Sequence, residues 1–263
     1  MKKWLFIIAF MTIACEDVVD IELPQGPVQL VVDAELSRAV GGTEATIVVD
    51  LSLTTDFYAE DITKVTDAVV VLHTGSEQLS VPQTEPGIYA ADLASLSEDT
   101  PYSIEVTHDN QTYSATEELM LSGTFDAATQ GDGQLFSGNE TEVVVTFTDL
   151  EGLDNYYLFD FGYNNLFVTR DRFYDGQQFS FSYFYDEFFP KNTEVHIRMV
   201  GIDEDFYNYM QILLSHSGQN GGGPFATATS ALKGNITNLT NPSSIALGYF
   251  RVVEHSSVPF TAE

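Results

Sequence analysis

The stretch ATIVVDLSL, at residues 45–53, decides the fold because its apolar side chains recur at every second position. Ile47, Val49 and Leu51 fall on one side of an extended chain, and Asp50 falls on the other. A period of two is the signature of a β-strand with one face against a core. The stretch therefore predicts a strand of a half-buried sheet.

The same alternation returns in the segments around it. YSIEVTH, at residues 102–108, places Tyr102, Ile104 and Val106 on one face and leads into a turn sequence typical of a tight hairpin. Further strand candidates are QLVVDAEL (29–36), DAVVVLH (67–73), GIYAADL (87–93) and QTYSATEEL (111–119). About seven short strands without a helical pattern predict an immunoglobulin-like β-sandwich over residues 28–120.

The composition changes after this sandwich. Residues 121–140 are dominated by Ser, Gly, Thr, Asp and Asn, which predicts a linker or a long loop. Strand patterns resume at TEVVVTFTDL (141–150) and NYYLFDFGY (155–163). The expected fold class is therefore mostly β: an N-terminal immunoglobulin-like β-sandwich followed by a second β-rich domain, residues 141–263, with one short helix.

The one expected helix begins after Asp203, a natural N-cap residue whose acidic neighbours Glu204 and Asp205 suit the positive end of the helix dipole. Gly218 is expected to end it. The apolar face expected for this helix consists of Phe206, Tyr209, Met210 and Leu213.

The chain is strongly acidic, with 39 Asp and Glu against 10 Lys and Arg and a formal net charge of −29. Such a surface repels nucleic-acid phosphates, so a nucleic-acid partner is excluded. The acidity can attract divalent cations or basic peptides, or it can simply keep a secreted protein soluble.

The N-terminus predicts export. Residues 1–14 combine Lys2 and Lys3 with an apolar run and the small residue Ala14, as signal peptides do. The apolar run is too short to span a bilayer comfortably, which favours a cleaved signal over an anchor helix.

Cys15 is the single cysteine of the chain and therefore has no disulfide partner within it. Together with Thr12, Ile13 and Ala14 it resembles a bacterial lipobox, in which the signal is cut before the cysteine. We therefore predict that Cys15 is lipidated with diacylglycerol and fatty acyl chains such as palmitate, and that residues 15–27 form the lipidated tether. Acyl chains contribute about 0.8 kcal/mol per buried CH₂, so several chains anchor a protein firmly.

Glu16 and Asp17 follow the cysteine directly. An acidic pair at this place resembles the surface-export signal of Bacteroidota lipoproteins, which implies the extracellular face of the outer membrane. The alternative is that both acids merely belong to a solvated tether.

An aromatic row is the preferred candidate for a ligand or partner surface. Phe179, Phe181, Tyr183 and Tyr185 alternate strictly, so in a strand they share one face. If that face is exposed, the rings can stack on sugars or apolar ligands; if it is buried, they are core.

The sequence contains no recognised motif for catalysis or metal binding. Asp149, Glu151 and Asp154 offer oxygen ligands for calcium in a turn, but their spacing differs from an EF-hand and also suits plain turn residues. The sequence has no HExxH, GxSxG, P-loop or GxGxxG motif, so we predict no catalytic residues, no metal site and no cofactor. None of the five histidines has the spacing of a metal-ligand motif; they are His73, His108, His196, His216 and His255.

Several segments together resemble a Bacteroidota outer-membrane lipoprotein family, domain of unknown function 4249. They span nearly the whole mature chain and include CEDVVDIELP, TPYSIEVTHDNQTYSATEEL, VTFTDLEGLDNYYLF, TEVHIRMVGIDEDFYNYMQIL and LGYFRV. The resemblance supplies no catalytic residues. It implies association with the outer membrane, often alongside TonB-dependent receptors.

The expected function is a surface-exposed outer-membrane lipoprotein that acts as a non-catalytic accessory binding subunit of a TonB-dependent transporter. One alternative is a structural or adhesive envelope lipoprotein, assisted by calcium. The other is a lipid-anchored hydrolase, whose catalytic carboxylates would come from distant parts of the chain.

Overall fold

The structure, a computed structural model, describes residues 26–56, 59, 61–75, 77–133, 135, 138–152, 154–217 and 232–263. The expected signal peptide, the acidic pair Glu16-Asp17, Cys15 and the expected helix end at Gly218 lie outside these ranges. Within them, no helix has the length and apolar character needed to cross a membrane.

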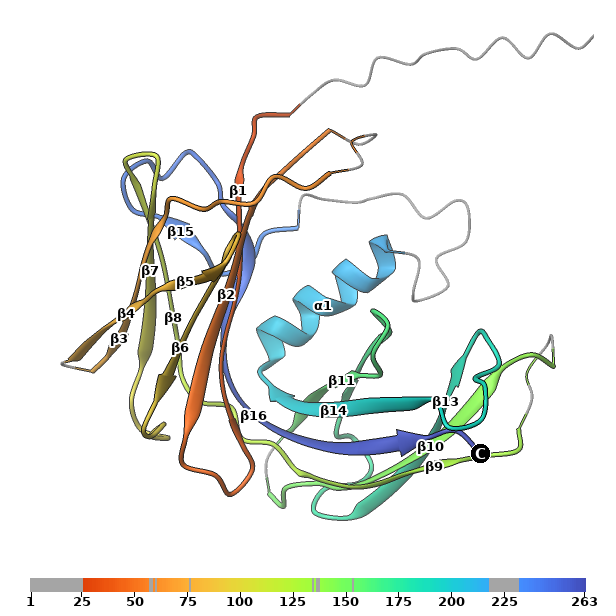
Figure 1. The fold of residues 1–263 in the computed structure, drawn as a ribbon. Coiled ribbons are helices and arrows are strands. Elements are labelled where there is room, and N and C mark those ends of the chain that lie inside the picture. The colour runs from red at the N-terminus through yellow and green to blue at the C-terminus, as the bar shows by residue number, and fades with distance from the viewer. Residues whose placement is uncertain are drawn as a thin grey trace, which may run out of the picture.

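The strands form three sheets (Figure 1). The largest has the order β12 (Leu166–Arg170), β11 (Tyr156–Asp160), β14 (Glu194–Ile202), β16 (Leu247–Thr261), β1 (Leu30–Ala39), β2 (Ala45–Leu53), β6 (Ile88–Leu93) and β5 (Gln83–Glu85). The second has the order β15 (Thr237–Asn238), β8 (Gln111–Glu117), β7 (Tyr102–His108), β3 (Val69–Thr74) and β4 (Glu77–Val81). The third has the order β13 (Gln178–Tyr185), β10 (Thr141–Thr148) and β9 (Thr124–Gln130).

One helix, α1 (Glu204–His216), completes the described part of the chain. The mostly β fold class with one short helix is thus confirmed. The N-cap is also as expected, because the side chain of Asp203 accepts a hydrogen bond from the Phe206 amide at 2.6 Å. The helix ends at His216. Its C-cap residue is Ser217, whose amide donates a hydrogen bond to the carbonyl of Leu213.

The N-terminal core is a β-sandwich. The inward side chains of the 45–53 stretch, Ile47, Val49 and Leu51, are fully buried. They pack with side chains of the second sheet such as Leu72 and Ile104. The alternation of the sequence therefore becomes one inner and one outer face in both layers.

The last strand joins the two halves of the chain. In Figure 1, β16 curves from the sandwich into the lower part of the molecule. It pairs in parallel with β1 over its first part and antiparallel with β14 over its second part. Phe250 and Val252 thereby enter the N-terminal core, whereas Phe260 enters the C-terminal core. The sandwich expected over residues 28–120 is therefore completed by a strand from the far end of the chain, which local composition cannot reveal.

The expected linker at 121–140 is wrong in its central part. Residues Thr124–Gln130 form β9, which pairs antiparallel with β10. A shift of register in this pairing breaks the period of two, so that Phe125 and Ala128, three positions apart, both reach the core. Such a bulge hides a strand from a search for strict alternation.

The C-terminal core lies between the third sheet and the β12–β11–β14–β16 end of the largest sheet. It is rich in rings: Phe147 meets Tyr157, Phe159 and Tyr174 edge to face, with ring centroids 5.4–5.6 Å apart. On the opposite face of the largest sheet lies α1, with Phe206, Met210 and Leu214 buried against it. In Figure 1 the helix occupies the inside of the curve that β16 makes.

Candidate functional site

A cleft of about 620 Å³ lies between α1 and the concave face of the largest sheet. Strands β1, β11, β14 and β16 supply its floor, and the loop after β11 contributes to its rim. Its apolar lining is Val31, Leu158, Leu166, Val200, Phe206, Met210 and Leu213. Its remaining side chains are those of Asp33, Glu35, Asp160, Tyr163, Asn164, Arg198, Tyr209, Tyr249 and Arg251.

The charged floor follows from the alternation of β1. Val32, Ala34 and Leu36 point into the N-terminal core, so Asp33 and Glu35 point to the opposite face, into the cleft. The parallel register places Glu35 directly beside Arg251 of β16. Strand β14 brings Arg198 to the same carboxylate.

Glu35 accepts hydrogen bonds from two guanidinium groups. Arg198 donates to both of its oxygens, at 2.6 and 3.3 Å, and Arg251 donates through Nε at 2.8 Å. Arg251 also donates to Asp33 at 2.6 Å. The side chain of Glu35 is 15% exposed and that of Arg251 18% exposed, whereas that of Asp33 is 62% exposed. The network is therefore sheltered at Glu35 and open at Asp33.

The network fixes the charge state of its members. Burial works to raise the pKa of Glu35, but the guanidinium groups of Arg251 and Arg198 outweigh it and lower this pKa to about 2. Burial likewise works to lower the pKa of Arg251, and the carboxylates of Glu35 and Asp33 raise it instead. Glu35 and Arg251 therefore stay charged at neutral pH. Three carboxylates, those of Asp33, Glu35 and Asp160, and two guanidinium groups line the cleft, so its formal charge is −1.

The wall of the cleft is aromatic. The guanidinium carbon of Arg251 lies 5.2 Å from the centre of the Phe206 ring, which ties the helix to the floor by a cation–π contact. Tyr249 lies 4.8 Å from Phe206 and 5.2 Å from Tyr209, measured between ring centroids. Tyr163, 65% exposed, lies at the rim. The site thus combines an apolar wall with polar groups at its floor.

The predicted aromatic row does not form an open surface. Tyr185 is buried, and its hydroxyl donates to the carbonyl of Phe161 at 2.6 Å. Tyr183 stacks on Phe161 with ring centroids 3.8 Å apart. Phe181 is also partly buried against the C-terminal core. Of the four rings, only Phe179, 39% exposed, offers much area to a ligand.

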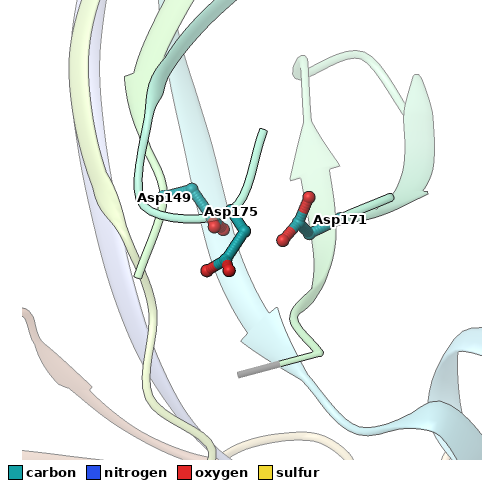
Figure 2. A group of neighbouring side chains, drawn as sticks. All are labelled: Asp149, Asp171 and Asp175. Carbon is teal, nitrogen blue, oxygen red and sulfur yellow. The ribbon is translucent and has the colours of Figure 1, made fainter. Parts of the chain in front are cut away.

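Of the three turn acids considered as calcium ligands, only Asp149 belongs to a carboxylate group in the described part of the structure. Asp149 lies near Asp171 and Asp175, and one carboxylate oxygen from each of the three residues lies within 4.8 Å of the other two (Figure 2). Glu151 and Asp154 are not part of this group. Neither Asp171 nor Asp175 was a candidate from sequence, because both lie in a separate loop that only the fold brings near.

Each of these carboxylates already has a partner. Asp149 accepts from the Tyr157 hydroxyl at 2.5 Å and from the Gly176 amide at 3.0 Å. Asp175 accepts from the amide of Gly152, and Asp171 accepts from that of Tyr174. Burial raises the pKa of Asp149, although both hydrogen bonds oppose that shift. The group holds two loops together, with oxygens that can also serve a cation.

Comparison with known protein families identifies the family to which the chain belongs. The family model described as Domain of unknown function (DUF4249) matches residues 16–257. The chain belongs to the DUF4249 family. The match includes the N-terminal core, the floor of the cleft, and the C-terminal core except Phe260 and Ala262. Comparison with curated proteins gave no match.

Among solved structures, the DUF4249 chain is similar to one titled "Anomalous substructure of Titin-A168169". Their sequences are 14% identical, and the alignment covers 67% of this chain and 92% of that chain. The TM-score is 0.24, so this likeness carries no argument about fold or function.

Proposed function

We propose that this member of the DUF4249 family is a lipid-anchored lipoprotein on the outer face of the outer membrane, and a non-catalytic accessory binding subunit of a TonB-dependent transporter. Three features of the sequence support the anchor: the export signal, the single cysteine Cys15 and the acidic pair Glu16-Asp17. The resemblance to outer-membrane lipoproteins that often lie alongside TonB-dependent receptors supports the partner.

The cleft between α1 and the largest sheet is the observation that carries the binding role. Ligand sites are typically concave, mostly apolar and provided with a few placed polar groups, and the cleft has this make-up. Glu35 and Asp33 together balance the charges of Arg198 and Arg251, so the carboxylate of Asp160 leaves the cleft with a formal charge of −1. The cleft therefore favours an amphipathic ligand, or a segment of the transporter, that carries a positive charge.

Co-purification tests this proposal. The tagged full chain is isolated from outer membranes that are solubilised in a mild detergent, and we expect a TonB-dependent receptor to come with it. Recovery of the lipoprotein alone, under conditions that preserve other receptor complexes, would contradict the proposed partner.

Two matched variants test the role of the cleft in the same experiment. Asp33→Asn removes an exposed charge at the cleft and should lower recovery of the receptor or ligand about tenfold. Glu105→Gln removes an exposed charge from β7, outside the cleft, and should leave recovery unchanged. Equal recovery with both variants would remove the cleft from the proposal.

The aspartate group supports one alternative function, a calcium-assisted structural or adhesive role in the envelope. Asp149, Asp171 and Asp175 present oxygens at a spacing that a cation can bridge. Because each carboxylate already accepts a hydrogen bond, we expect millimolar calcium to leave the Tm unchanged. A rise in Tm with calcium that disappears in Asp171→Asn would support the alternative role.

A further inference from the structure

Strand β13 leaves one edge of the third sheet unpaired. It pairs with β10 over eight residues in an unbroken antiparallel register, and among the described strands β10 is its one partner. Along such an edge, alternate backbone N–H and C=O groups point away from the sheet. Gln178–Tyr185 is therefore a template on which a further strand can add.

The other sheet edges in the described part of the chain are protected. β15, β5, β12 and β4 have two, three, five and five residues, and β4 begins with Glu77. β9 has seven residues, as β7 and β8 do, but its register is shifted and it carries Asp126. Short length, bulges and charges are the usual means by which proteins prevent edge pairing. β13 has none of them.

The sequence of β13, QFSFSYFY, contains no charge, no proline and no glycine. Its outer face presents the exposed residues Gln178, Ser180 and Ser182 and the half-buried Phe184. Phe179, near the start of the strand, lies on its inner face and is 39% exposed at the margin of the C-terminal core. A strand added beside β13 would meet mostly polar side chains on one face and rings on the other, and this selects a segment in which polar and apolar residues alternate.

The segments that form the third sheet carry acids and no basic side chain, and the nearest basic residues in the sequence are Arg172 and Lys191. Residues 124–148 and 175–189, which contain the whole third sheet, include no Lys, Arg or His. Their acids are Asp126, Asp132, Glu140, Glu142, Asp175, Asp186 and Glu187. Asp175 and Asp186 lie beyond the two ends of the strand, so cationic residues at both ends of an added segment would meet opposite charge.

A second copy of this chain fits the edge poorly. Antiparallel pairing of two β13 strands would bring Asp186 of one copy toward Asp175 of the other. Each chain also carries a formal net charge of −29, and like charges brought together across an interface cost several kcal/mol. The charge pattern thus favours a basic partner over self-association.

We infer that β13 is a docking edge for an extended segment of a partner protein, with alternating polar and apolar residues and lysine or arginine at both ends. The segment adds to the third sheet as a fourth strand through backbone hydrogen bonds. This inference is independent of the lipid anchor and of the cleft, which lies on the opposite face of the largest sheet from the C-terminal core.

A synthetic peptide tests the inference on the full chain. The probe has a core of alternating valine and threonine, about as long as β13, and lysines at both ends. We expect saturable binding in fluorescence anisotropy, with amide hydrogen exchange slowed in Gln178–Tyr185. Two control peptides, one with glutamates at the ends and one with every core amide N-methylated so that neither edge can donate, should bind at least about tenfold more weakly.

Two variants at one exposed position complete the test. Ser182→Lys places a like charge on the edge and should weaken binding of the lysine-ended peptide about tenfold, whereas Ser182→Thr should leave it unchanged. Equal Tm values would show that both variants fold. Absence of binding, equal binding of the glutamate-ended peptide, or protection outside β13 would overturn the inference. A dimer in sedimentation that Ser182→Lys dissociates would overturn it in favour of a second copy.

Discussion

The two cores of this protein are built from different side chains. The N-terminal core is mostly aliphatic, with Val, Leu and Ile at alternate positions of its strands. The C-terminal core is mostly aromatic and includes seven buried Phe and Tyr rings on β10, β11, β13 and the loops beside them: Phe147, Tyr157, Phe159, Phe161, Tyr174, Tyr185 and Phe189. Aliphatic alternation indicates burial without ambiguity, whereas an aromatic row suits a core and a ligand surface equally well.

The largest expected effect is at the centre of the aromatic core. Phe147→Ala should lower the free energy of unfolding by about 4 kcal/mol, because it removes a fully buried ring that contacts four or more others. Ile47→Val, in the aliphatic core, should cost about 1 kcal/mol. Urea unfolding measures both. A loss below about 1 kcal/mol for Phe147→Ala would mean that the aromatic core is not packed as described.

The ion network on the cleft floor comes next. Glu35→Gln leaves Arg198 and Arg251 without their shared carboxylate and should cost about 2 kcal/mol, less than a fully buried pair because all three side chains keep some exposure. Asp33→Asn, at the exposed end, should cost less than about 1 kcal/mol. If both variants lose a similar free energy of unfolding, the network is not more sheltered at Glu35 than at Asp33.

The pH dependence of stability distinguishes Glu35 from Glu117. The lowered pKa of Glu35 means that its contribution is present above the ordinary value of 4.5 and is lost as the pH falls toward about 2. Glu117 behaves in the opposite sense. Burial, and then the charges of Asp203 and Asp205, raise its pKa to about 7 against an opposing hydrogen bond from Asn235.

The folded state therefore binds the Glu117 proton more tightly than the unfolded state does, and stability falls as the pH rises from 4.5 to about 7. Glu117→Gln should remove this part of the slope, as measured by Tm across that range. An unchanged slope in the variant would assign the titration to another group.

The smallest effect concerns the aromatic row itself. Tyr185→Phe removes the hydroxyl that donates to the Phe161 carbonyl and should cost about 1 kcal/mol. Tyr183→Phe keeps the stacked ring and should cost less, by urea unfolding. A larger loss for Tyr183→Phe would show that the row is held by contacts other than these.

The sequence predicts what depends on short-range patterns. Alternation identified the strands around residues 45–53 and 102–108, and a side-chain cap identified the start of α1. Both signals lie within a few neighbouring residues, where backbone geometry fixes which side chains share a face.

The features that were missed depend on distant pairing. The contact between Glu35 and Arg251 joins residues 216 positions apart, and it exists because β16 pairs in parallel with β1. The polar face of β1 was visible in QLVVDAEL, but the arginines that would meet it were not. Strand β9 was hidden by its bulge, and the aspartate group by its division between two loops.

The proposed role as a lipid-anchored binding subunit depends first on the chemistry at Cys15. Mass spectrometry of the N-terminal peptide from native membranes tests it most directly, with Cys15→Ser as an unacylated control and Thr12→Leu as a control that keeps the lipobox pattern. The predicted result is a chain that begins at Cys15 and carries diacylglycerol on its sulfur. A chain that begins at Met1, or one that begins at Cys15 with a free thiol, would contradict the proposal.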